Sequence, residues 1–143
     1  MSSLRRVAIL GGNRIPFARS NGAYATASNM DMPTAAIDGL VSRYKLEGER
    51  LGEVAAGAVL KLARDFNMTR EVVLSTKLAP ETAACDMQQA CGTGLQALNY
   101  IANKIATGQI ESGIGGGVDT TSDAPIAVSE ELRQFMLSLN RCK

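Results

Sequence analysis

One stretch of this 143-residue chain decides its fold: Asp86-Met87-Gln88-Gln89-Ala90-Cys91-Gly92-Thr93-Gly94-Leu95-Gln96-Ala97. An extended segment ends at Cys91, and apolar residues then recur at helical spacing until Gly108. The pattern predicts a tight strand-to-helix turn that carries the Cys91 thiol. The first N–H groups of a helix have no helical partner, and the helix dipole adds positive charge there. A cysteine in this position is therefore favoured as the nucleophilic thiolate.

The rest of the chain alternates strand-like and helix-like patterns. We expect strands near 6–11, 54–60, 83–89 and 112–118, helices near 32–46, 69–78 and 91–107, and a last amphipathic helix over 130–139. Strands separated by helices favour an α/β fold, here with a mixed, mainly parallel sheet covered by helices. The helix after Cys91 is expected to be the most deeply buried, because its apolar face carries Leu95, Leu98, Ile101 and Ile105.

Composition excludes several classes of protein. Hydrophobic residues make up 45% and charged residues 20% of the chain, and its net charge is +1. These values exclude a disordered tail and argue against binding to nucleic acid through bulk charge. No apolar run is long enough for a membrane span, and the start lacks the pattern of a secretory signal. We therefore expect one cytoplasmic domain over 1–143 without a membrane span.

The titratable side chains limit the chemistry further. The chain has no histidine, which removes the commonest general base and His-ligated metals. Cys85, Cys91 and Cys142 are an odd number of cysteines in a chain without export signals, so we interpret them as free thiols. Asp119 and Asp123 could hold a cation, although two carboxylates without further ligands are more often loop caps.

Three motifs follow one another along the chain: Arg14-Ile15-Pro16-Phe17, Cys-Gly-Thr-Gly-Leu-Gln-Ala from Cys91, and Gly-Gly-Gly-Val-Asp-Thr-Thr-Ser-Asp-Ala-Pro from Gly115. Together they resemble the thiolase family, in particular acetyl-CoA acetyltransferases and 3-ketoacyl-CoA thiolases. The resemblance implies that an acyl-CoA or acetyl-CoA substrate acylates Cys91, whose backbone N–H would be an oxyanion donor. It implies CoA thioester substrates in fatty acid metabolism, no cofactor, and a homodimer or homotetramer with segment 82–89 at the dimer interface.

The chain also departs from the family pattern. Ile15, Thr93, Asp119 and Thr121 stand where the family commonly has Thr, Ser, Glu and Met. These changes leave the reaction class in place and affect the expected acyl-chain preference. Thiolases have two similar halves and a loop domain, and the second half carries a Gly-His-Pro motif and a second reactive cysteine. This chain has no histidine, and Cys142 lacks that motif, so the resemblance implies a truncated N-terminal half that is inactive alone.

Other interpretations remain open from the residues alone. Cys91 could pack as a small buried hydrophobe, as many free cysteines do. The chain could be a non-catalytic module that folds, dimerises or binds acyl-CoA weakly. It could also be a redox-sensing thiol protein that uses Cys85 and Cys91, although the usual Cys-x-x-Cys spacing is missing. In the thiolase interpretation, Cys85 has a role in core or dimer packing.

Overall fold

The computed structural model describes residues 4–141, so Cys142 lies outside the described residues. The elements in chain order are α1 (Asp31–Tyr44), β1 (Glu53–Ala56), the 3-10 turn η1 (Ala63–Asp65), α2 (Met68–Ser75), β2 (Ala83–Asp86), α3 (Thr93–Ala106), β3 (Gly113–Gly115) and α4 (Glu130–Arg141). The predicted helices over 32–46, 69–78, 91–107 and 130–139 are thus confirmed, with bounds that move by up to three residues.

The three described strands form one sheet in the order β2-β1-β3. Both pairs are parallel, with Val54 in register with Ala84 on one side and with Ile114 on the other. The α/β fold is therefore confirmed, but the described sheet is wholly parallel rather than mixed. Each strand is shorter than its apolar run because the chain leaves the ladder toward the loops that carry the site.

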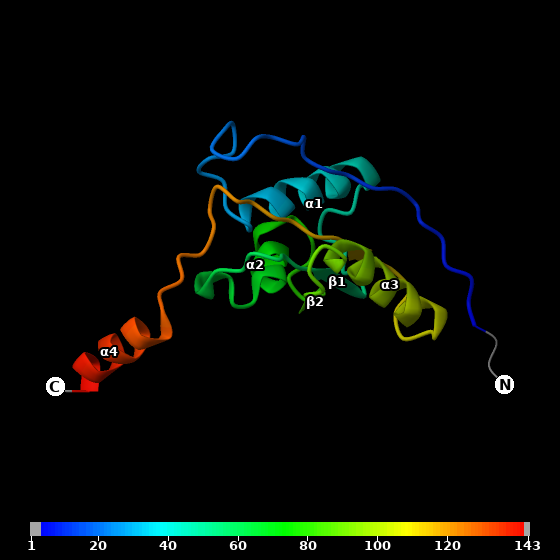
Figure 1. The fold of residues 1–143 in the computed structure, drawn as a ribbon. Coiled ribbons are helices and arrows are strands. Elements are labelled where there is room, and N and C mark those ends of the chain that lie inside the picture. Colours follow the sequence, from blue (N-terminus) through cyan, green and yellow to red (C-terminus); the bar gives the residue numbers. More distant parts are fainter. Residues whose placement is uncertain (1–3, 142–143) are drawn as a thin grey trace.

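Helices cover both faces of the sheet (Figure 1). Val54 and Ala56 of the central strand pack with α1 and α2 in the main core. Ala55, which points to the opposite face, packs against Ala97 and Ile101 of α3. All four residues of β1 are buried, as expected for a parallel strand between two helical layers.

The expected strand over 6–11 does not form. The segment is extended but unpaired, and Ile9 and Leu10 are 75% and 84% exposed. Figure 1 shows this part of the chain, in dark blue, running outside the helices. It is held by α1 instead: the Tyr44 hydroxyl donates to the Leu10 carbonyl, and Arg43 donates to the Gly12 carbonyl. An apolar run becomes a strand only where a neighbouring strand accepts its hydrogen bonds, and here none does.

The expectation that the helix after Cys91 is buried most deeply is also wrong. Met68, Val72 and Val73 of α2 are fully buried, whereas Leu95 of α3 is 67% exposed. Small residues explain the difference. A Cβ on Gly115 would lie 2.6 Å from the Leu98 Cα, so α3 approaches the sheet backbone closely and its large side chains extend sideways.

The last helix, α4, stands apart from the layered body (Figure 1). None of its residues is buried, and Phe135 is 59% exposed. Neither α4 nor any other described helix combines the length and apolar character needed to cross a membrane.

Asp86 fixes the end of β2 to the start of α2. Its carboxylate accepts the N–H groups of Met68 and Thr69 at 3.1 and 2.7 Å and an ion-pair hydrogen bond from Lys61. Burial acts to raise the pKa of Asp86, but the hydrogen bonds from Lys61 and Thr69 outweigh it and hold the pKa below its ordinary value of 3.8. The segment from Asp86 to Cys91 therefore starts from an anchored point.

We predict that Asp86→Asn lowers the free energy of unfolding by about 1–3 kcal/mol at neutral pH, because Lys61 and two helix N–H groups lose a charged acceptor. Since the folded pKa is depressed, this contribution is complete above the unfolded pKa and is lost as pH falls through the folded pKa. Urea unfolding at neutral and acidic pH measures both effects. Glu81→Gln, on an exposed carboxylate, is the control. Equal losses in the two variants would contradict this role.

Candidate active site

Cys91 lies exposed on the turn between β2 and α3. The preceding residue, Ala90, has φ +45°, in the left-handed region that non-glycine residues rarely adopt. Such a conformation costs on the order of 1–3 kcal/mol and persists only where its surroundings impose it. The turn that presents the thiol is therefore held by its neighbours rather than by its own backbone preference.

Thr93 supplies most of that restraint. Its hydroxyl accepts the Gln89 N–H at 2.8 Å and donates to the Ala90 carbonyl at 2.7 Å. The Gly92 N–H closes the turn on the Gln89 carbonyl at 2.9 Å. These hydrogen bonds engage the N–H groups of Gln89 and Gly92, whereas the Cys91 N–H has no hydrogen-bond partner among the described residues. The Cys91 N–H is thus a donor placed beside the thiol of the same residue.

The N-terminus of α3 adds positive charge at this point. Gly92 is its N-cap, no side chain caps the helix, and its first turn has no acidic residue. The N-terminal N–H groups and the dipole of a helix of 14 residues are therefore uncompensated by side chains. Negative charge on the Cys91 sulfur, or on an oxygen bound beside it, is favoured here by about 0.3–1 kcal/mol, and by up to about 2 kcal/mol in a partly buried setting.

The thiol opens into a cavity of about 250 Å³. The cavity is bounded by the segment after β1, the start of α3 and the segment after β3, through Gly57, Ala90, Cys91, Thr93, Gly94, Gly117, Val118 and Asp119. All three segments follow the carboxyl ends of parallel strands, which is where open α/β sheets bind their ligands.

Glycines let these three segments meet. A Cβ on Gly57 would lie 1.8 Å from the Met87 carbonyl oxygen, so no larger residue fits without moving the backbone. A Cβ on Gly117 would lie 3.3 Å from both the Gly57 carbonyl oxygen and the Gly94 Cα. Where these glycines meet, the cavity wall is backbone in close contact, which brings peptide groups next to the thiol.

The two aspartates act as loop anchors. The Asp119 carboxylate accepts the N–H groups of Val59 and Leu60, each at 2.9 Å, and so fixes the loop after β1 to the segment after β3. Asp123 pairs with Arg64. The loop-cap interpretation is thus confirmed for Asp119, whereas Asp123 forms a side-chain ion pair instead. The described residues contain no group of three or more His, Cys, Asp or Glu side chains that could hold a metal ion.

The other residues singled out from the sequence lie elsewhere. Cys85 is half-buried on β2, where its thiol donates to the Asp86 carbonyl at 3.5 Å. Arg14 and Phe17 line a second cavity rather than the cavity of Cys91. Sequence reasoning missed Gly57, although a glycine within a strand-like run signals a close backbone approach. It also missed the left-handed Ala90, for which the sequence has no signal.

The comparisons with known proteins agree with this geometry. A family model described as "Thiolase, N-terminal domain" matches residues 7–141. The chain belongs to the thiolase family. The 3-ketoacyl-CoA thiolases of Shewanella loihica and Shewanella denitrificans are 36% and 35% identical to this thiolase chain over 138 residues, which is 96% of the chain and 32% of each relative.

Solved structures show the same fold. The human mitochondrial 3-ketoacyl-CoA thiolase matches 83% of this thiolase chain with a TM-score of 0.78 at 27% identity, and the match covers 30% of that protein. The Bacillus anthracis acetyl-CoA acetyltransferase matches 90% of it with a TM-score of 0.84 at 23% identity, which covers 33% of that protein. The chain thus spans about a third of the length of the relatives it matches.

We predict that Thr93→Val lowers the free energy of unfolding by about 1–3 kcal/mol and slows alkylation of Cys91. The variant leaves the Gln89 N–H unpaired and removes one of the two hydrogen bonds to the Ala90 carbonyl, which still accepts the Thr93 N–H, so the strained turn relaxes away from the helix N-terminus. Thr93→Ser keeps the hydroxyl and is the matched control, with both properties close to those of the parent. Urea unfolding and the rate of iodoacetamide labelling measure the effect. Indistinguishable Val and Ser variants would show that the hydroxyl does not hold the turn.

Proposed function

We propose that this chain is the nucleophile-bearing domain of a thiolase-type acyltransferase and that Cys91 is its acyl acceptor. One observation carries the proposal: an exposed thiol lies on a strained turn, at an uncapped helix N-terminus, in a cavity with backbone walls. An inert structural cysteine needs none of these features. The family membership and the names of the relatives give the chemistry to which this arrangement is suited.

The proposed reaction begins with attack of the Cys91 thiolate on the carbonyl carbon of a CoA thioester. The carbonyl oxygen becomes an oxyanion, which the Cys91 N–H and the N-terminus of α3 stabilise. Collapse of this intermediate expels the CoA thiolate, which takes a proton, and leaves the acyl group as a thioester on Cys91. In condensation, a carbon nucleophile formed by removal of an α-proton from a second CoA thioester takes the acyl group and releases the Cys91 thiolate. Thiolysis is the reverse: the thiolate attacks the 3-keto carbon of a 3-ketoacyl-CoA, the carbon-carbon bond breaks, the leaving carbanion is protonated to acetyl-CoA, and a CoA thiol then takes the acyl group from Cys91. No cofactor takes part in either direction.

We further propose that this chain alone does not complete the catalytic cycle on CoA thioesters. It has no histidine to activate the thiol, and the carbon-carbon bond step needs a second positioned base. The relatives are about three times as long, and residues 7–141 match the thiolase N-terminal domain. A non-catalytic module with the thiolase fold is therefore the second candidate function, favoured by the missing histidine.

The proposed setting is a cytoplasmic homodimer or homotetramer that acts in fatty acid metabolism. Two observations support it. Cys85 and Cys91 are both free, as in a reducing compartment. The strand β2 lies at one edge of the described sheet, so segment 82–89 has a free edge to pair with its copy across a two-fold axis.

Limiting iodoacetamide tests the role of the thiol. We expect the label first on Cys91, with Cys91→Ser abolishing the fast phase and Cys85→Ser leaving it unchanged. We expect no acetoacetyl-CoA thiolysis at rates typical of an enzyme, because loss of even one oxyanion donor costs about 100–1,000-fold. First labelling at another cysteine would remove Cys91 from its role. Enzyme-like thiolysis would show that the chain supplies the missing base itself.

Light scattering tests the assembly. We expect a mass of two or four chains at micromolar concentration, and a shift toward one chain for Ala83→Lys, because a lysine on an exposed edge strand opposes pairing. Glu71→Lys, on the exposed side of α2, is the control and should keep the parent mass. A folded parent chain with the mass of one copy would contradict the proposed assembly.

A further inference from the structure

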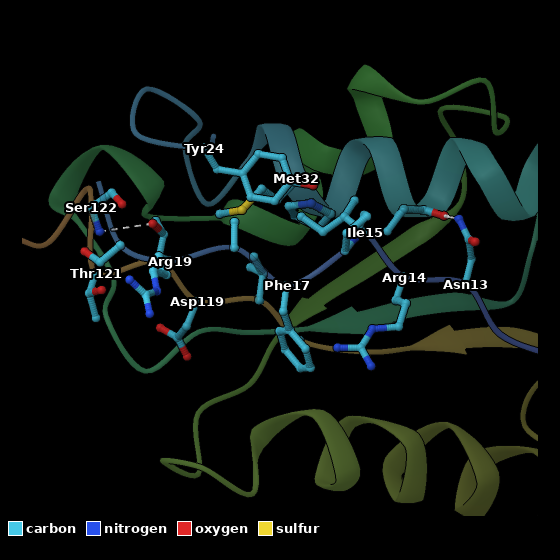
Figure 2. A pocket seen from close by; sticks show the side chains of 18 residues that line it. Asn13, Arg14, Ile15, Phe17, Arg19, Tyr24, Met32, Asp119, Thr121 and Ser122 are labelled. Carbon is cyan, nitrogen blue, oxygen red and sulfur yellow. Dashed lines mark hydrogen bonds between the residues drawn. The ribbon is translucent and has the colours of Figure 1, made fainter. Parts of the chain in front are cut away.

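The helix that follows Cys91 packs on the sheet through small residues. The strands lie between this helix, α3, and α1 on the other face (Figure 2). The buried residues on the α3 side are Ala55 of β1 and Ala97 and Ile101 of α3. The neighbouring strand β3 adds glycines, and a Cβ on Gly113 would lie 2.9 Å from the Ile101 Cγ2. Such residues allow a close approach, but they form few ridges that would fix a helix at one place along the sheet.

Glu53 adds a polar contact to this interface. It is the first residue of β1, and because side chains alternate along a strand, it points to the same face as Ala55. Its Oε1 accepts a hydrogen bond from the Tyr100 hydroxyl at 3.1 Å, and its Oε2 accepts an ion-pair hydrogen bond from Lys104. Only 7% of the Glu53 side chain is exposed. Both oxygens of a buried carboxylate are therefore engaged by α3.

The two donors define where α3 lies. Tyr100 and Lys104 are four residues apart, so they lie one above the other on the same face of the helix, and the Lys104 Nζ is 4.9 Å from the centroid of the Tyr100 ring. Within residues 4–141, no other side chain of α3 forms a hydrogen bond or ion pair with β1, β2 or β3. A shifted helix would leave the Glu53 carboxylate buried without its partners, which is strongly unfavourable.

The position of α3 in turn decides the geometry at Cys91. The start of the helix touches the segment after β3, where a Cβ on Gly117 would lie 3.3 Å from the Gly94 Cα. A helix rises about 1.5 Å per residue, so a shift by a single residue would open this contact or drive it into overlap. Asp86 fixes the other end of the segment that presents the thiol. Ala90 keeps its positive φ between these two fixed ends.

We propose that Glu53 is a positioning residue for Cys91. Through Tyr100 and Lys104 it holds α3 at one place along β1, and so fixes the N-terminus of the helix at the cavity into which the thiol opens. Glu53 begins β1, whereas the cavity lies beyond the carboxyl ends of the strands and does not include Glu53. It therefore acts through the helix and not by contact with the thiol. The inference rests on the proposed function, because the reactivity of Cys91 is the property that this position serves.

Glu53→Leu tests the proposal, because it removes both acceptors and keeps a side chain of similar volume. We expect the iodoacetamide labelling of Cys91 to slow about two- to fivefold, the factor by which a helix dipole typically favours a thiolate, and the pH of half-maximal labelling to rise. Lys104→Met removes only the cation and should act in the same direction. Lys104→Arg keeps the charge and should label at the rate of the parent.

Val72→Ala is the control for a general loss of stability. It truncates a fully buried side chain of α2, in the core on the other face of the sheet, and should leave the labelling of Cys91 unchanged. Circular dichroism checks that each variant is folded, and Lys104→Met carries the test if Glu53→Leu does not fold. Labelling at the parent rate in the Glu53 and Lys104→Met variants, or equal slowing in Val72→Ala, would overturn the proposal.

Amide hydrogen exchange separates this proposal from the proposed function, because it does not depend on the reactivity of the thiol. We expect the segment over 87–94 to exchange faster in Glu53→Leu than in Val72→Ala, as followed by mass spectrometry. Equal exchange in the two variants would contradict the positioning role. Slow labelling of Cys91 in the parent, together with the expected difference in exchange, would contradict the proposed function and leave Glu53 as the residue that positions α3.

Discussion

The structure depends on the close approach of three backbone segments beneath Cys91. Gly57, Gly94 and Gly117 follow β1, begin α3 and follow β3, and their peptide groups lie in mutual contact. A side chain on Gly57 would collide with the Met87 carbonyl, so the contact requires glycine. On this close-packed base, the hydrogen bonds of the Thr93 hydroxyl hold the turn before α3 and keep Ala90 in its left-handed conformation.

Two carboxylates keep these segments in place from either side. Asp86 holds the end of β2 on the N-terminus of α2, and Asp119 holds the loop after β1 on the segment after β3. Neither is needed as an acid or a base in the proposed chemistry. Both satisfy backbone N–H groups that would otherwise be unpaired near the cavity. The environment of the thiol is thus set by backbone donors and by anchored loops, and the carboxylate that lines its cavity, Asp119, is engaged in holding one of those loops.

Much of this arrangement could be predicted from the sequence. The apolar runs predict the three paired strands, and the change from strand-like to helical periodicity at Cys91 predicts the turn. The apolar run over 6–11 has the same pattern, but a strand also needs a neighbouring strand to accept its hydrogen bonds. The pattern of apolar residues does not show whether such a neighbour exists. The sequence predicts deeper burial of α3 than the structure shows, because the small residues of β3, and not the large side chains of α3, set the distance between the helix and the sheet. The positive φ of Ala90 depends on the hydrogen bonds that Thr93 makes across the turn, and no pattern in the sequence signals it.

Transfer of an acetyl group from acetyl-CoA to the protein tests the central claim most directly. The chain is incubated with acetyl-CoA, and the intact mass and the modified peptide are determined by mass spectrometry, with Cys91→Ser and Cys85→Ser in parallel. The account predicts one acetyl group per chain on the peptide that contains Cys91, released by added thiol, retained in the Cys85 variant and lost in the Cys91 variant. Acetylation of Cys85 or Cys142 in preference, or of lysines alone, would contradict it.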